Sequence, residues 1–321
     1  MKSRYSSQSG FSLVELLVGL VISLLVLVAV ISSLAFTETQ KRITLGTNVA
    51  LESLSIASLE LSKNVRMAGF GVTSCLSTAY LIDSVSGIST SNFSIKSNNS
   101  NTDALTIFYG DSNTGYATAK VSSISTNTTF STVDYMGGLK AGSLALLSDS
   151  TKCEIHKLNA ADIVNNSFIT ATAISSAYTT VSTTTVSSLS ELKQNTYSIV
   201  NNELQEADDF NDTSTSIVGN IVAFKAYYGL IDGTFVKADN SSGKDFGVLT
   251  ADTIKLIRSI RVFMVSKNPI KDICNPTLTA PVSWLNGPVV DLSADPNWKC
   301  YHYKSIDYII PLINAIPVTT V

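Results

Sequence analysis

Proline is absent from the first 268 residues of this 321-residue chain: all seven prolines lie at or beyond Pro269. Proline breaks helices because it lacks a backbone N–H and its ring clashes with the preceding turn. Nothing in this long N-terminal stretch therefore forbids an uninterrupted helix. The length of the chain permits one large domain or two small ones.

Charged residues are also scarce. Asp, Glu, Lys and Arg make up 15% of the chain and hydrophobic residues 45%, a composition poorer in charge than that of a typical soluble domain. The net charge is −3, and cations cluster only at the extreme N-terminus. Because nucleic-acid binding needs a basic surface, we expect no direct contact with nucleic acid.

The residue types of catalysis and metal binding are sparse. The two histidines, His156 and His302, lie in no recognisable nucleophile motif, and the chain has no phosphate-binding loop or dinucleotide fingerprint. Pairing each histidine with Cys153 or Cys300 gives irregular spacing for zinc. The acidic run at 208–212 lacks the spacing of a calcium loop. We predict no enzyme, no metal and no cofactor.

What the chain has is a long apolar run. Residues 11–36 carry a single charge, Glu15, and about 20 apolar residues suffice to span a bilayer. Lys2 and Arg4 precede the run, so the positive-inside rule places the N-terminus in the cytoplasm. An uncleaved single-span anchor is one interpretation. A carboxylate in such a span costs about 2.5–3.5 kcal/mol, which predicts a compensating partner for Glu15.

The order of residues gives a more specific interpretation. The window Gly10-Phe11-Ser12-Leu13-Val14-Glu15 resembles the processing site of type IV prepilins and type II secretion pseudopilins. The resemblance implies cleavage between Gly10 and Phe11 by a membrane-embedded prepilin peptidase, followed by N-methylation of Phe11. It also implies an assembly role for Glu15, which attracts the N-terminal amine of a neighbouring subunit; the alternative is a carboxylate that stays protonated or reaches the interface.

After residue 36 the chain turns polar but keeps a helical pattern. Two apolar stripes recur at spacings of three and four, and Gly69 and Gly71 predict the end of the helix. We expect a helix over residues 11–67, with one stripe packing on the protein's own sheet and the other on neighbouring helices. The first stripe is Ala50, Leu54, Ala57, Leu61, Val65 and Ala68, and the second is Leu45, Val49, Ile56 and Leu59.

The rest of the chain reads mostly as β structure. Alternating apolar residues between turn signals predict strands over 103–110, 143–147, 153–158, 217–228, 258–264 and 306–312, and a hairpin that turns at Asn201-Asn202. Pro311 predicts an edge strand or the end of a strand. Residues 73–194 are rich in Ser, Thr and Asn. We expect this region to be too polar for a core and to form loops or exposed β surface.

Further sequence segments narrow the resemblance to one type of pilin. The ending NVRMAGFG at residues 64–71 resembles the end of the first helix in PilW-type minor pilins, and segments from about Asn195 onward are loosely similar to the same type. This implies an α+β, pilin-like fold: a long N-terminal helix, its first half transmembrane, packed on an antiparallel β-sheet head. The predicted divisions are a leader (1–10), a transmembrane and assembly half of the helix (11–36), an amphipathic half (37–70) and a periplasmic or extracellular head (71–321).

Four cysteines, Cys75, Cys153, Cys274 and Cys300, lie in the part expected outside the cytoplasm, where disulfides persist. Four cysteines allow three connectivities. We favour Cys75–Cys153, which would tie the end of the helix to the sheet, and Cys274–Cys300, which would close a proline-rich loop. Free buried thiols are the alternative.

Three functions are compatible with these features. The PilW-type resemblance implies a minor pilin that helps prime type IV pilus assembly and joins the pilus tip. Its implied partners are other minor pilins, the major pilin, the prepilin peptidase, the inner-membrane assembly platform and a PilY-type adhesin; adhesion, twitching motility and DNA uptake would follow indirectly. It would lie in the bacterial inner membrane before assembly and at the pilus tip or cell surface after it. The alternatives are a J-like pseudopilin of type II secretion and a membrane-anchored periplasmic enzyme or binding protein.

Overall fold

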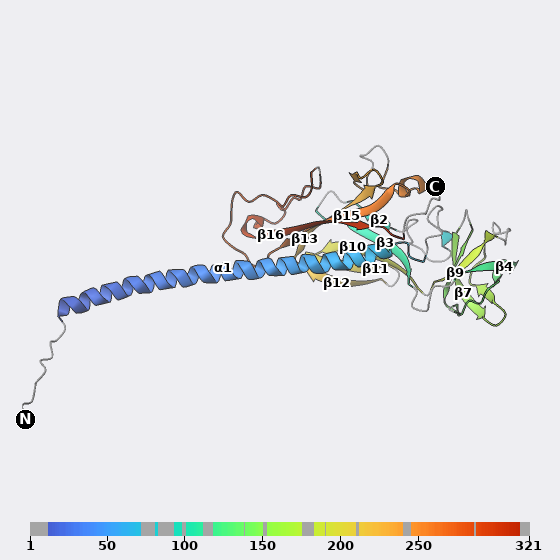
Figure 1. Cartoon of the computed structure of the whole chain (residues 1–321), viewed down its shortest axis with the longest axis horizontal. Coiled ribbons are helices and arrows are strands. Elements are labelled where there is room, and N and C mark those ends of the chain that lie inside the picture. Colours follow the sequence, from blue (N-terminus) through green and yellow to red (C-terminus); the bar gives the residue numbers. More distant parts are fainter. Residues whose placement is uncertain are drawn as a thin grey trace, which may run out of the picture.

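The computed structural model of the chain is a long helix that carries a β-rich head on its C-terminal half, while its first half projects beyond the head (Figure 1). The antiparallel sheets of the head confirm the predicted fold class. The structure describes residues 12–71, 81–82, 93–97, 101–111, 118–137, 139–149, 153–174, 183–189, 191–209, 212–239, 245–285 and 287–314.

Helix α1 (Leu13–Met67) runs for 55 residues without a break, which is about 82 Å at 1.5 Å per residue. Its end has a local cause. Gly69 and Gly71 have φ angles of 76° and 73°, a left-handed conformation that glycine adopts without strain. The predicted helix is confirmed from Leu13 onward, and Phe11 lies outside the described residues.

A five-stranded antiparallel sheet packs beside the second half of α1. Its hairpin turns at Asn201 and Asn202, as predicted, and both residues have positive φ (52° and 62°), the conformation that a two-residue turn of this type requires. In spatial order the strands are β12 (Thr213–Gly219), β11 (Glu203–Asp208), β10 (Glu191–Val200), β3 (Ala104–Asp111) and β2 (Phe93–Lys96).

A four-stranded antiparallel sheet completes the part of the head that contacts the helix. Its edge strand ends at Pro311, as expected of a residue that cannot donate to a ladder. A short helix, α2 (Ala251–Ile254), precedes its third strand, with a capping box between Thr250 and Thr253. In spatial order the strands are β14 (Phe235–Val236), β13 (Ile221–Leu230), β15 (Ile257–Lys267) and β16 (Tyr303–Pro311).

The long strand predicted over 217–228 is confirmed from Ile221 onward as β13, but the predicted range runs across a break between two strands. Asn220 adopts φ of 65° and separates β12 from β13, which belong to different sheets. A left-handed residue ends the extended run and redirects the chain. Asparagine tolerates this conformation better than most residues. The asparagine itself is therefore the signal for the break, whereas the hydrophobic pattern does not change there.

One core joins α1 to both sheets. The ammonium of Lys225 on β13 lies 3.0 Å from Asp103 Oδ1, next to β3, and Asp103 Oδ2 accepts from the Ala226 N–H at 3.0 Å. Asp103 is 2% exposed. Buried charges are tolerated when they are paired and hydrogen-bonded, so this contact fixes how the two sheets meet.

The region 73–194 contains a second core, so the expectation that it is too polar for one is wrong. Phe130 and Phe168 stack with ring centroids 5.3 Å apart and are both fully buried. Around them lies a seven-stranded sheet: β1 (Leu81–Ile82), β7 (Cys153–Asp162), β6 (Leu144–Ser148), β9 (Thr185–Leu189), β4 (Thr118–Thr126), β5 (Thr129–Thr132) and β8 (Ser167–Thr170) in spatial order.

This second sheet closes on itself. β8 pairs with β5 on one side and with the second half of β7 on the other, so six of its strands form a ring. The β1–β7 pair is parallel and the other described pairs are antiparallel. Closure removes free sheet edges. This small barrel lies past the C-terminal end of α1, where β4, β7 and β9 appear in Figure 1.

Candidate functional site

The first half of α1 is the candidate site. Every residue from 12 to 42 is exposed, and in the described part of the chain α1 is the helix long and apolar enough to cross a membrane. Residues 13–36 alone span about 36 Å as a helix, against a hydrocarbon core of about 30 Å. The apolar helix therefore fits anchoring in the inner membrane.

Glu15 lies in the first turn of α1 and is exposed there. A carboxylate in this place interacts favourably with the helix dipole, but the fold offers it no buried partner within the described residues. Gly10 and Phe11 fall outside the described residues, so the cleavage site between them stays a prediction.

Two of the hydroxyl groups within the apolar half, those of Ser23 and Ser32, are satisfied by the helix itself. Ser23 donates to the carbonyl oxygen of Gly19 at 2.7 Å, and Ser32 donates to that of Val28 at 2.9 Å. In lipid a polar group without such a bond costs several kcal/mol. These serines therefore do not prevent the segment from crossing a bilayer as a continuous helix.

The helix meets the head at Gly46. This buried residue lies against the side chain of Asn268, which is 1% exposed. The Asn268 Nδ2 group donates to the carbonyl of Ile43 at 3.5 Å, and its Oδ1 accepts from the Ile270 N–H at 2.8 Å. Sequence reasoning missed this contact; the signal was a glycine in the middle of a helix, where it costs stability unless close packing needs it.

The two predicted apolar stripes of the helix differ in their burial. The first packs on the head and is confirmed, because each of its six residues is at most 2% exposed. The second lies on the solvent side. Its exposed fractions are 52% for Leu45, 40% for Val49, 43% for Ile56 and 72% for Leu59. Exposed apolar side chains at helical spacing suit contact with another helix.

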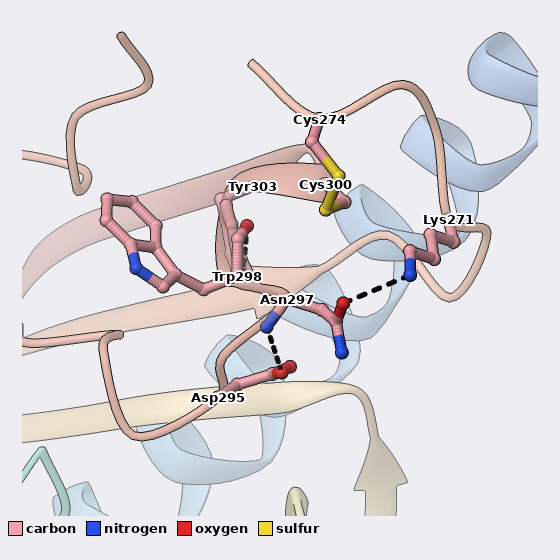
Figure 2. Close-up of a disulfide and its surroundings, with 7 residues drawn as sticks. All are labelled: Lys271, Cys274, Asp295, Asn297, Trp298, Cys300 and Tyr303. Carbon is pink, nitrogen blue, oxygen red and sulfur yellow. Dashed lines mark hydrogen bonds between the residues drawn. A yellow bond between two sulfur atoms is a disulfide. The ribbon is translucent and has the colours of Figure 1, made fainter. Parts of the chain in front are cut away.

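The loop after β15 returns toward the helix and is closed by a disulfide. Cys274 and Cys300, 26 residues apart, are joined, and Lys271 on the same loop donates to Asn297 Oδ1 at 3.1 Å (Figure 2). Cys75 and the side chain of Cys153 lie outside the described residues, so their pairing stays a prediction.

The far part of this loop is clamped to the sheet by Trp284. The guanidinium of Arg261 lies 4.0 Å from the Trp284 ring and 4.6 Å from the Phe235 ring. The same group donates to both oxygens of Asp307 at 2.8 and 2.6 Å. Sequence reasoning placed Arg261 on a strand but did not find this clamp, because its partners lie 46 and 23 residues away.

Each histidine contacts a carboxylate. His156 Nε2 lies 3.0 Å from Glu154 Oε2, and both residues are buried. His302 Nε2 lies 3.0 Å from Asp272 Oδ2, and this contact holds the pKa of Asp272 below its ordinary value. Cys300 is committed to the disulfide. Within the described residues no group of three or more His, Cys, Asp and Glu side chains converges on a metal position.

Within the acidic run at 208–212, Asp209 is held by hydrogen bonds. Asp209 Oδ2 accepts from the Gln194 side-chain amide and from the Thr196 hydroxyl, both at 2.8 Å. Both donors lie on β10, so this carboxylate serves to hold the end of the β10–β11 hairpin.

The comparisons with known proteins place the strongest likeness at the N-terminus. The chain has no sequence match among the curated proteins. Among solved structures, the chain is similar to the type IV-like pilin TTHA1219 from Thermus thermophilus. The two share 10% sequence identity, the match covers 83% of this chain and 98% of that chain, and the TM-score is 0.39. A family model described as the prokaryotic N-terminal methylation motif matches residues 5–31. The chain therefore carries this methylation motif at the head of its free helix, which supports a protein of the type IV pilin or pseudopilin class.

Proposed function

We propose that this protein is a minor pilin that helps prime type IV pilus assembly and forms part of the pilus tip complex. The observation that carries the proposal is the continuity of the methylation motif with a free apolar helix. The motif covers residues 5–31, and all described residues up to Arg42 are exposed. An apolar helical segment that buries none of its side chains in its own head is suited to be buried in a membrane or against other subunits.

Maturation is the first step. The prepilin peptidase removes residues 1–10 and cuts between Gly10 and Phe11, and Phe11 is then N-methylated. The new α-amine has an ordinary pKa near 8, so it is cationic at neutral pH. Residues 11–36 hold the chain in the inner membrane, residues 37–70 connect the span to the head, and residues 71–321 form the head outside the cytoplasm.

Glu15 then serves as the registration residue. Its carboxylate is tolerable in lipid only beside a cation, because an uncompensated charge in low dielectric is heavily penalised. The methylated amine of a neighbouring pilin supplies that cation. The exposed second stripe, Leu45 to Leu59, gives the same neighbour an apolar face to pack on, so the charge pair and the stripe select one relative position.

The closed barrel supports a place at the tip. It lies beyond the C-terminal end of α1, on the side of the head away from the span (Figure 1). Subunits that stack along a filament need room above each head, and a terminal subunit has no neighbour above it. Other minor pilins and the major pilin are the proposed lateral partners, and a PilY-type adhesin is the proposed partner at the barrel.

The test is mass spectrometry of the N-terminus in cells with and without the prepilin peptidase. The proposal expects a species that begins at methylated Phe11 only when the peptidase is present. A natural product that retains its first ten residues would overturn it. Deletion of the gene then separates a pilin from a pseudopilin, since loss of surface pili with normal secretion of exoproteins identifies the pilus role.

A further inference from the structure

A groove of about 500 Å³ separates α1 from the segment that leads into the disulfide-closed loop. One wall is formed by Glu38, Thr39, Arg42 and Ile43 of the helix, and the other by residues 270–273. The helix wall begins two residues after Phe36, where the apolar run ends. The groove therefore lies at the point where the helix leaves the proposed membrane span.

The height of the groove above the hydrocarbon follows from helix geometry. Residues 38–43 lie about 3–10 Å beyond Phe36 at 1.5 Å per residue. The headgroup layer on each side of a bilayer is about 5–8 Å thick, the difference between the whole bilayer and its hydrocarbon core divided over two leaflets. A loop that packs beside residues 38–43 is thus held at the level of the lipid headgroups.

The side chains at this level suit an anionic lipid surface. Lys41 and Lys271 are exposed, and within the described residues neither has a carboxylate partner. The two nearby carboxylates are already engaged, Glu38 with Arg42 at 3.4 Å and Asp272 with His302 at 3.0 Å. The local excess of charge is therefore positive, which attracts anionic headgroups.

Ile273 adds an apolar contact. Its side chain is 87% exposed, and it is followed directly by Cys274, whose disulfide to Cys300 ties the loop down (Figure 2). A fixed loop loses little freedom when it binds. An isoleucine beside lysines at the headgroup level is the composition of an interfacial membrane contact.

We propose that residues 270–273, together with Lys41, form a contact surface for anionic lipid headgroups on the outer face of the inner membrane. This inference rests on the membrane span of the proposed function. The contact orients the head over the bilayer while the chain waits for assembly, and it is broken when the helix is drawn out of the membrane.

Leu285 provides a matched control. It is 89% exposed and lies within the disulfide-closed loop that Ile273 directly precedes, but its neighbour Trp284 packs on Arg261. Arg261 lies seven residues before Asn268 on β15, about 23 Å along a strand. At one end of β15, Asn268 contacts the helix at Ile43, near the membrane span. At the other end, Arg258 bonds to Leu312, and Asn314, two residues further on, bonds to Arg66 near the C-terminal end of the helix. Moving from Asn268 to Arg261 therefore leads away from the span.

The experiment uses the full-length protein in vesicles of phosphatidylglycerol and phosphatidylcholine, part of the latter carrying a nitroxide on the headgroup. Three variants add one tryptophan each: Ile273→Trp, Leu285→Trp and Phe36→Trp. Their quenching is compared with that of the parent protein, which has Trp284 and Trp298. The proposal expects severalfold stronger quenching of the tryptophan added at 273 than of that added at 285.

The controls separate this inference from the proposed function. Quenching at position 36 reports insertion of the span. If position 36 is quenched and positions 273 and 285 behave alike, the headgroup contact is wrong and the span stands. If position 36 is not quenched, the chain does not insert and both ideas fail. Replacing phosphatidylglycerol by phosphatidylcholine, or Lys271 by Gln, is expected to lower quenching at 273 and not at 36; no change at 273 would overturn the role of charge.

Discussion

Asn268 lies so close to Gly46 that a methyl group on residue 46 would overlap its amide. The amide has little room to move, since Asn268 is 1% exposed and its Oδ1 accepts from the Ile270 N–H. This contact sets the position at which the rod-like helix enters the head.

Gly46→Ala tests that relationship. Alanine favours a helix over glycine by about 1 kcal/mol, whereas overpacking of a buried contact costs about 1–3 kcal/mol. We expect a net loss of stability of the head, measured by thermal unfolding in detergent. Gly19→Ala is the control, because a methyl group on Gly19 would meet nothing within 4 Å apart from the nearby backbone of its own helix; an equal effect of both changes would contradict the packing argument.

Asp103→Ala should destabilise the head far more than a surface change. Removing the carboxylate takes from the Lys225 ammonium, 10% exposed, the negative charge that lies 3.0 Å away. The cost of breaking such a pair is about 3–5 kcal/mol. Chemical denaturation measures it, and the double variant Asp103→Ala with Lys225→Met should recover part of the loss. A double variant no more stable than the single one would show that the charge is not the cause.

Loss of the Cys274–Cys300 disulfide should lower stability by about 3.5 kcal/mol in the chain-entropy model for a loop of this length. The measurement is the unfolding midpoint of the variant with both residues changed to Ser, under oxidising conditions. Reductant added to this variant tests the other pair. A further drop in the midpoint is expected if Cys75 and Cys153 are joined, and no drop would contradict that pairing.

The sequence was sufficient to predict those elements that depend on local features of the chain. The apolar stripe ending at Ala68, the Asn201-Asn202 turn and the strand that ends at Pro311 each depend on local periodicity or on one residue's backbone preference, and the structure has all three. The Gly46–Asn268 contact joins residues 222 positions apart, beyond the reach of any local pattern.

The second core shows where composition misleads. Ser and Thr dominate residues 73–194, but a small closed sheet needs only the inward side of each strand to be apolar. Phe130 and Phe168, the two aromatic residues of this core, come from two four-residue strands. Averaging over the region hides them, because the outward residues are polar.

Glu15→Ala is expected to leave cleavage after Gly10 largely intact and to impair incorporation into pili. Cleavage depends on the peptidase recognising the leader, whereas incorporation needs the charge that pairs with a neighbour's amine. Mass spectrometry of the N-terminus and immunoblots of sheared pili measure the two steps. Glu38→Ala is the matched control, since its carboxylate lies just outside the apolar run and pairs with Arg42; equal loss in both variants would argue against pairing in the membrane.

The stability that the Asp272–His302 contact contributes should depend on pH only in the acidic range. Its hydrogen bond from His302 is the main cause of the lowered pKa of Asp272. A lowered folded-state pKa gives stabilisation that is complete above the unfolded value, about 4, and is lost as the pH falls through the folded value. His302→Ala should raise the Asp272 pKa, followed by NMR titration of its carboxyl carbon. An unchanged titration would mean that His302 does not set it.

The unbroken course of α1 has a mechanical consequence. A force applied to the membrane end travels along a helix with no proline hinge, and it first reaches the head where Gly46 and Asn268 interlock. Extraction from the bilayer therefore loads the contact between the helix and the sheets. The strength of this contact limits the force that the subunit can bear without unfolding.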